Sequence, residues 1–192
     1  MSQVCRLLGL AVFLVCVSST PGLPLIDSPR YAFLDRARVV HVVAPNLLKL
    51  KLLRDDSVVT VRLLGVGSPR NRDRIRHLRP EVLGYIAREN IWEAAREYVE
   101  SVTKGEIVEV YTRAWDRYDE KHRLLGYIVV PSGSGEPLDL NGNLIEKGLG
   151  FVTRDYVHVT FVRYRDLEEE AKRNRRGLWG ALSLERVSSL AK

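Results

Sequence analysis

The chain has 192 residues, of which 45% are apolar and 28% are charged. This balance is typical of a folded globular protein and argues against a disordered, fibrous or multi-span membrane chain. A domain of this length buries enough apolar surface to be stable without a disulfide or a metal ion. The formal net charge of +6 favours anionic partners such as nucleic acid or an acidic membrane, although an excess of this size is not specific by itself.

The first residues have the pattern of a secretory signal peptide. Arg6 supplies a positive charge, residues 7–17 form an uncharged apolar run, and small polar residues follow. The run is shorter than the roughly twenty residues that span a bilayer as a helix. We therefore predict cleavage after Ser19 and a secreted or periplasmic mature chain without a stable membrane span. The alternatives are a lipoprotein modified at Cys16 and an uncleaved N-terminal membrane anchor.

Both cysteines, Cys5 and Cys16, lie inside this predicted signal peptide. The mature chain would therefore have no disulfide, thiol nucleophile or cysteine metal ligand. Removing residues 1–19 deletes one charge, that of Arg6, so the net charge changes only from +6 to +5. The basic balance thus belongs to the rest of the chain. We divide the chain into a signal peptide, an N-terminal lead, one domain and a C-terminal tail: residues 1–19, 20–35, 36–181 and 182–192.

Three segments at the start of the domain are predicted to be β-strands. In residues 37–43, 47–53 and 57–66, apolar residues alternate with others and β-branched residues are frequent. Turn-forming residues, Pro45-Asn46 and residues 54–57, separate these segments. The sequence therefore predicts a three-stranded antiparallel meander.

The rest of the domain is predicted to contain a helix, two strands and two further helices. The helices cover residues 90–103, 140–147 and 161–175, and the strands cover residues 107–112 and 124–130. A glycine shortly after each predicted helix ends it. Five strands with an interposed helix indicate an α+β, mainly β fold of the OB-barrel type, whose open face often binds oligonucleotides.

Five motifs follow one another in a characteristic order along the domain. They are VRLLGVGSP (61–69), EAAREYV (93–99), DRY with RLLGYI (116–118 and 123–128), LNGNLIEKGLGFV (140–152) and EEEAKRNRRGLWG (168–180). In this order they resemble the staphylococcal-nuclease-like, or thermonuclease, family over residues 36–181. The resemblance implies a five-stranded OB-fold barrel with about three helices. It also implies a hydrolase, commonly secreted, that cleaves DNA and RNA phosphodiesters with Ca²⁺.

The resemblance implies a pair of arginines that hold the scissile phosphate. Arg62, in the first motif, matches one of them, and Arg123, directly before LLGYI, matches the other. The second match departs from the family pattern, because residues 119–122 (DEKH) stand where the family has a single glycine. Two guanidinium groups suit a phosphate, since each offers parallel donors and stays charged at working pH. The alternative is that both are ordinary solvated arginines.

The carboxylates through which the family holds Ca²⁺ and activates water are replaced in this chain. Asn46, Gly67 and Ser68 stand at the metal positions, and Arg70 stands at the position of the family's glutamate base. Ca²⁺ usually needs several oxygen ligands that include carboxylates, and a guanidinium cannot act as a base near neutral pH. Asn46 and Ser68 remain as weak candidate ligands. We therefore expect Ca²⁺ as the cofactor by family resemblance only, without strong binding.

A basic insertion follows Pro69. It places five arginines within ten residues: Arg70, Arg72, Arg74, Arg76 and Arg79. Such a cluster can neutralise several phosphates and would make binding dependent on salt, whereas the alternative is a solvated loop. Tyr118 is a candidate for stacking against a nucleic-acid base.

These observations leave three functions. The one we favour is a secreted, monomeric thermonuclease-family protein that binds nucleic acid, DNA or RNA, or another polyanion through its arginines, with nuclease activity weak or lost. The second is an active metal-dependent endonuclease with a rebuilt site. The third is a secreted module that binds a partner protein. Acids that could rebuild a metal site lie near Arg123 and in the turn before the third strand: Asp55, Asp56, Asp116, Asp119 and Glu120.

Overall fold

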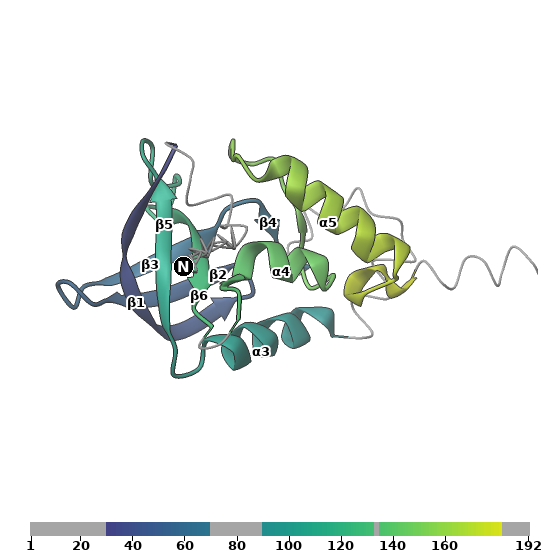
Figure 1. Cartoon of the computed structure of the whole chain (residues 1–192), viewed down its shortest axis with the longest axis horizontal. Coiled ribbons are helices and arrows are strands. Elements are labelled where there is room, and N and C mark those ends of the chain that lie inside the picture. The colour runs from purple at the N-terminus through teal and green to yellow at the C-terminus, as the bar shows by residue number, and fades with distance from the viewer. Residues whose placement is uncertain (1–29, 70–89, 133–134, 182–192) are drawn as a thin grey trace, which may run out of the picture.

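The computed structural model of the protein describes residues 30–69, 90–132 and 135–181. In this part of the chain, five strands close into a barrel and three helices lie to one side of it and beneath it (Figure 1). The barrel strands are β1 (Tyr31–Ala44), β2 (Leu47–Leu52), β3 (Val58–Leu63), β5 (Ile107–Arg113) and β6 (Leu124–Val130). The predicted α+β, mainly β fold of OB-barrel type is confirmed.

The barrel is an antiparallel sheet that closes through one parallel pair of strands. The sheet order is β3-β2-β1-β5-β6, which confirms the predicted meander of the first three strands. β3 then pairs in parallel with β6, and Arg62 lies opposite Leu125 in this pair. Short strands complete the sheets: β7 (Leu138–Asp139) extends the order beyond β6, and β4 (Val66–Gly67) pairs with β8 (Phe151–Val152).

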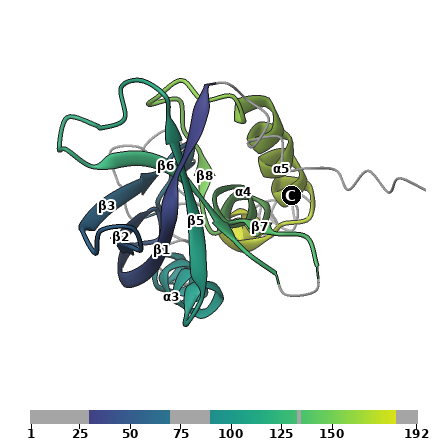
Figure 2. The ribbon, with the colours of Figure 1, turned by 60° about the vertical axis from the view of Figure 1, so that its left-hand side comes forward.

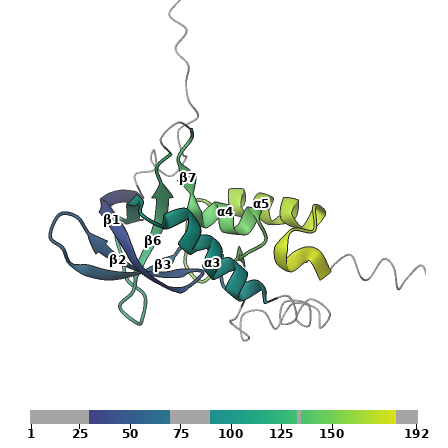
Figure 3. The ribbon, with the colours of Figure 1, turned by 90° about the horizontal axis from the view of Figure 1, so that it is seen from below.

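The three helices lie close to their predicted positions. They are α3 (Ile91–Thr103), α4 (Leu140–Glu146) and α5 (Phe161–Arg173), followed by the 3-10 turn η1 (Gly177–Ala181). α3 buries residues spaced four apart and covers the barrel from below (Figure 3). α4 lies between the barrel and α5 (Figure 2). The Asp139 carboxylate caps the start of α4 by accepting a hydrogen bond from the Gly142 N–H.

The core fills the barrel and the space between the barrel and the helices. β6 is buried along its whole length, because β3 and β5 flank it and α4 packs against it. β2 buries Leu48, Leu50 and Leu52 and turns the residues between them outward, as the period of two predicted. Tyr127 and Tyr164, both fully buried, join β6 to α5.

Two segments differ from the ranges that the sequence predicts. β1 begins at Tyr31, well before residue 37, because its first half pairs with β5 and the pairing register shifts between Phe33 and Asp35. That shift interrupts the alternation by which a strand is read from sequence. The third predicted strand ends at Leu63, because Gly65 has a φ of +76° and turns the chain before β4.

The remaining predictions fall partly outside the described residues. The predicted signal peptide, all five arginines of the basic insertion and the C-terminal tail lie there. In the part of the chain that the structure describes, none of the helices has the length and apolar character needed to cross a membrane.

Candidate functional site

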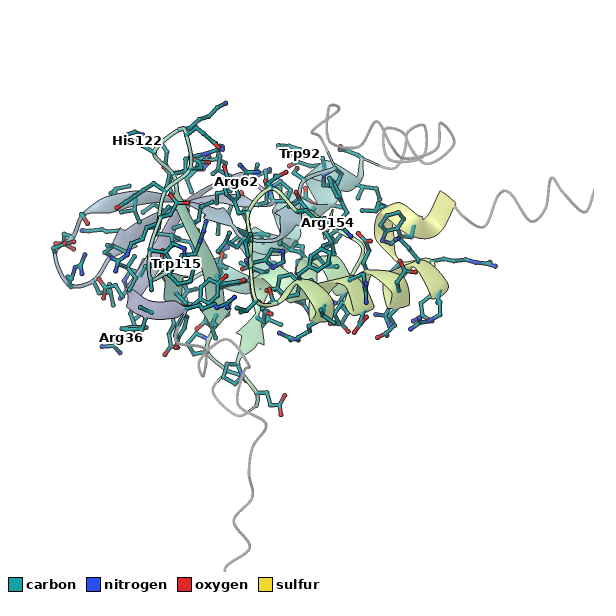
Figure 4. All side chains as sticks on the ribbon, turned by 90° about the horizontal axis from the view of Figure 1, so that it is seen from above. Arg36, Arg62, Trp92, Trp115, His122 and Arg154 are labelled. Atoms are coloured by element: carbon teal, nitrogen blue, oxygen red, sulfur yellow. The ribbon has the colours of Figure 1, made fainter. Side chains whose placement is uncertain are left out.

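A cavity of about 450 Å³ opens between β3, the turn that follows β1, the start of α3 and residues 120–123. In the view of Figure 4, Arg62 lies between the turn that carries His122 and the start of α3, which carries Trp92. The cavity wall contains residues that the sequence assigned to phosphate or metal binding: Asn46, Arg62, Gly67, Ser68 and Arg123. The fold thus brings together positions up to 77 residues apart, from 46 to 123.

Arg62 is held by residues of the loop between β8 and α5. Its side chain is 11% exposed, and its Nη2 lies 2.7 Å from Asp155 Oδ2. Nη1 donates to the Tyr156 hydroxyl at 3.5 Å, and the guanidinium carbon lies 5.1 Å from the centre of the Tyr156 ring. Arg62 is therefore a partly buried, paired arginine rather than a solvated one.

Asp119 connects the two arginines. Its Oδ2 accepts a hydrogen bond from Arg123 Nε at 2.7 Å and lies 3.6 Å from Arg62 Nη1. Its Oδ1 accepts hydrogen bonds from the backbone N–H groups of Lys121 and Arg123, at 2.9 and 3.0 Å. The Asp119 side chain is fully buried, whereas that of Arg123 is 24% exposed. This buried carboxylate from the inserted turn therefore contacts both guanidinium groups from the protein interior. We call Arg62 and Arg123 the arginine clamp.

Asp119 is ionised at neutral pH despite its burial. Burial alone would raise the pKa of this carboxyl group, but the hydrogen bonds from the Arg123 side chain and from the backbone outweigh it. The pKa of Asp119 therefore lies below its ordinary value. A negative charge fixed between two guanidinium groups also reduces the repulsion between them.

Glu120 and Tyr156 join the inserted turn to the loop after β8. The Tyr156 hydroxyl donates to Glu120 Oε2 at 2.9 Å. A backbone hydrogen bond and this bond from Tyr156 lower the pKa of Glu120. Burial and the hydrogen bond to Glu120 raise the pKa of Tyr156. Among the described residues of the cavity wall, Glu120 is the one carboxylate.

The residues at the family's metal positions do not fit a resident Ca²⁺. The Asn46 Nδ2 donates to the Val66 carbonyl at 2.9 Å, and the Ser68 hydroxyl is buried without a hydrogen-bond partner among the described residues. A Cβ atom at Gly67 would lie 2.3 Å from the Phe151 ring, so a side chain there has no room unless Phe151 moves. One amide oxygen and one hydroxyl do not replace the carboxylates that Ca²⁺ usually requires. Within residues 30–69, 90–132 and 135–181, no group of three His, Cys, Asp or Glu side chains is arranged to hold a metal ion.

The other acids proposed for a rebuilt metal site lie elsewhere. Asp116 Oδ2 is 3.4 Å from Arg113 Nη1, just after β5. In the turn between β2 and β3, Asp55 accepts hydrogen bonds from Ser57, and Asp56 pairs with Lys51 at 3.0 Å. These three carboxylates thus have partners of their own, away from the cavity wall. Asp119 and Glu120 remain as the acids of this set that lie at the clamp.

Among the described residues, one predicted nucleic-acid contact, Tyr118, is not part of the cavity wall. Tyr118 is 54% exposed and forms an isolated β-bridge with Leu124. It is next to Asp119 in the chain but is not part of the cavity wall. Arg70 and the rest of the basic insertion lie outside the described residues.

Sequence reasoning missed several residues of the site, among them Asp155, Tyr156 and Trp92. Asp155 and Tyr156 contact Arg62 from more than ninety positions away, and no local pattern connects them. Trp92, at the start of α3, lines the cavity. From sequence, its position in the helix is equally compatible with the face that packs against the barrel. From sequence, a residue of the site could be found only through a motif shared with the family. These residues fall outside the two motifs that contain the arginines, so they were not found.

The chain matches a known protein family. A family model described as staphylococcal nuclease homologue matches residues 60–181, which is 122 of the 192 residues. The matched segment begins within β3, two residues before Arg62, and includes the whole inserted turn. A search of curated proteins found no match. The matched segment and the closed barrel together establish that the chain belongs to the staphylococcal nuclease homologue family.

Proposed function

We propose that this nuclease-family protein binds nucleic acid phosphodiesters, or another polyanion, through the arginine clamp, and that its Ca²⁺-dependent cleavage is weak or absent. The observation that carries the proposal is the buried carboxylate of Asp119, which contacts both Arg62 and Arg123 at one cavity wall. Guanidinium groups held in place lose little freedom when a phosphate binds, and charge-assisted hydrogen bonds to phosphate are strong.

The expectation of weak cleavage rests on what the site contains besides the clamp. Hydrolysis of a phosphodiester needs an activated water molecule and neutralisation of the charge that develops in the transition state. Asn46, Gly67 and Arg70 stand where the family has acids. Glu120 reaches the wall, but its carboxylate accepts a hydrogen bond from Tyr156 and its pKa lies below the ordinary value, which makes it a weaker base than an ordinary glutamate. The clamp can therefore hold a phosphate, whereas Glu120 is a weak base for the activation of water.

We also propose that the protein is exported. The charge at Arg6, the apolar run of residues 7–17 and the small residues before Thr20 support this proposal. We expect the exported protein to begin at Thr20, and mass spectrometry of its N-terminal peptide measures this. An intact Met1 on the exported protein would favour the membrane-anchored alternative.

The test of function compares two double variants. The protein from Thr20 onward is incubated with single-stranded DNA and RNA in the presence of Ca²⁺, Mg²⁺, Mn²⁺ or a chelator. Arg62→Ala with Arg123→Ala removes the clamp. Arg165→Ala with Arg173→Ala removes the same charge from exposed positions of α5. We expect the clamp variant to lose most of its affinity, the α5 variant to keep it, and turnover to be slow in all cases.

The clamp variant leaves Asp119 buried without its partners, so folding is checked by circular dichroism. Arg62→Lys with Arg123→Lys serves as a second variant, because lysine keeps the charge but loses the forked donors. Chelator-sensitive turnover that disappears in the clamp variant would establish the active endonuclease instead. Equal affinity in the clamp and α5 variants would show that nucleic acid does not bind at the clamp, and absence of binding by every variant would favour the module that binds a partner protein.

A further inference from the structure

The loop between β8 and α5, residues 153–160, is held near both of its ends by hydrogen bonds to other parts of the protein. The Thr153 N–H donates to the Gly65 carbonyl at 3.0 Å, and the Val159 N–H donates to the Tyr31 hydroxyl at 3.3 Å. Between these two attachments, Asp155 and Tyr156 reach Arg62. The loop therefore presents a carboxylate to the clamp without being part of the barrel.

Asp155 occupies a donor of Arg62 that a phosphate would need. Its Oδ2 lies 2.7 Å from Arg62 Nη2, which is the distance of a full charge-assisted hydrogen bond. The Asp155 side chain is 23% exposed, whereas that of Asp119 is fully buried. Asp119 thus contacts Arg62 from the protein interior, whereas Asp155, which is not part of the cavity wall, contacts it from a position that solvent partly reaches. Of the two carboxylates, Asp155 is the one that an incoming anion can replace.

The charges around the clamp balance. Among the described residues, the cluster consists of three cations and three carboxylates: Arg62, Lys121, Arg123, Asp119, Glu120 and Asp155. The cluster itself therefore offers little net positive charge to a phosphate, whatever the attraction by the rest of the basic chain. Displacing a carboxylate from Arg62 would both free a donor and leave a positive charge for the phosphate to neutralise.

We propose that Asp155 is an internal competitor for phosphate at Arg62. In the free protein its carboxylate takes the place of a phosphodiester oxygen, and the ligand binds only as the ion pair between Asp155 and Arg62 opens. This inference rests on the proposed function, because it concerns the same clamp and the same phosphodiester ligand. It adds that the affinity of the clamp is limited by the protein's own carboxylate.

The experiment uses a fluorescein-labelled single-stranded oligothymidylate and fluorescence anisotropy at fixed salt. Asp155→Asn is compared with Asp166→Asn, which removes the same charge from an exposed position of α5. We expect Asp155→Asn to bind about tenfold more tightly than the unchanged protein, since a competing hydrogen bond to a charged group is lost. Asp166→Asn should change the affinity by less than about twofold. A gain in affinity cannot result from a loss of folding.

A second pair of variants locates the effect at Arg62. In the Arg62→Ala background, Asp155→Asn should no longer raise the affinity, because the competition requires the guanidinium. Asp155→Asn binding no tighter than Asp166→Asn, or an equal gain without Arg62, overturns the inference while the proposed function stands. Absence of binding by every variant overturns the proposed function, and the inference with it.

Discussion

The buried carboxylate of Asp119 contacts both arginines of the clamp, so removing its charge should lower the stability of the protein. Asp119→Asn keeps the shape of the side chain but leaves two guanidinium groups without their shared counter-charge. Because Arg62 and Arg123 keep some contact with solvent, we expect a loss of about 2 kcal/mol in the free energy of unfolding, below the value for a fully buried pair. Urea denaturation at pH 7 measures this loss. Asp56→Asn, in the exposed turn between β2 and β3, is the control.

The same variant has a predictable pH dependence. The pKa of Asp119 is lowered in the folded protein, because hydrogen bonds from Arg123 and the backbone outweigh its burial. Its contribution to stability is therefore complete above its ordinary pKa of about 4 and is lost as the pH falls toward the lower, folded value. Between pH 7 and pH 3, the unchanged protein should lose more stability than Asp119→Asn. Parallel curves for the two proteins would contradict the assigned role.

At the scale of elements, the turn between β3 and β4 supports the loop that carries Asp155. Gly65 has a φ of +76°, and a Cβ atom there would lie 2.6 Å from the His158 ring. Gly105, after α3, has a φ of +79° with open space around it. We therefore expect Gly65→Ala to cost about 3 kcal/mol and Gly105→Ala about 1 kcal/mol, since both strain the backbone and only the first is overpacked. Thermal denaturation of the two variants measures the difference, and equal losses would show that His158 yields freely.

The elements themselves follow from local patterns in the sequence, whereas much of the site does not. β2 was predictable because Leu48, Leu50 and Leu52 alternate with outward-facing residues, and α3 because its buried residues recur every four positions. The pairing of Arg62 with Asp155 joins residues 93 positions apart, so no periodicity indicates it. Asp119 lies in a charged turn, which from sequence reads as solvated. Asp119 differs from the exposed acids near it in the chain because it is buried, and its burial depends on the closed barrel.

At the scale of the whole molecule, we expect the binding of a polyanion to depend also on charges beyond the clamp. If the arginines at positions 70, 72, 74, 76 and 79 contact phosphates, replacing all five by alanine should flatten the dependence of log affinity on log salt by about 0.7 to 0.9 per lost contact. The affinity should fall alike for all sequences. Titration of labelled single-stranded DNA at several salt concentrations measures both effects.

The control for this variant removes the same charge from other exposed positions. Glutamine is introduced at five of them: Arg54, Lys104, Lys147, Arg165 and Arg173. An unchanged salt slope in the alanine variant would show that the insertion is only a solvated loop. A slope that changes equally in the control would show that net charge, rather than the insertion, governs binding.

The parallel pairing of β3 with β6 links the assembly of the site to the closure of the barrel during folding. This pair sets Arg62 opposite Leu125, two residues after Arg123, so the register that closes the barrel also brings the clamp together. Contacts between segments so distant in sequence form slowly, because the intervening chain must first lose its freedom. A partly folded chain with an open barrel has no clamp. If the proposed function is right, a ligand that needs the clamp would bind the closed barrel and, by mass action, would make separation of β3 from β6 rarer.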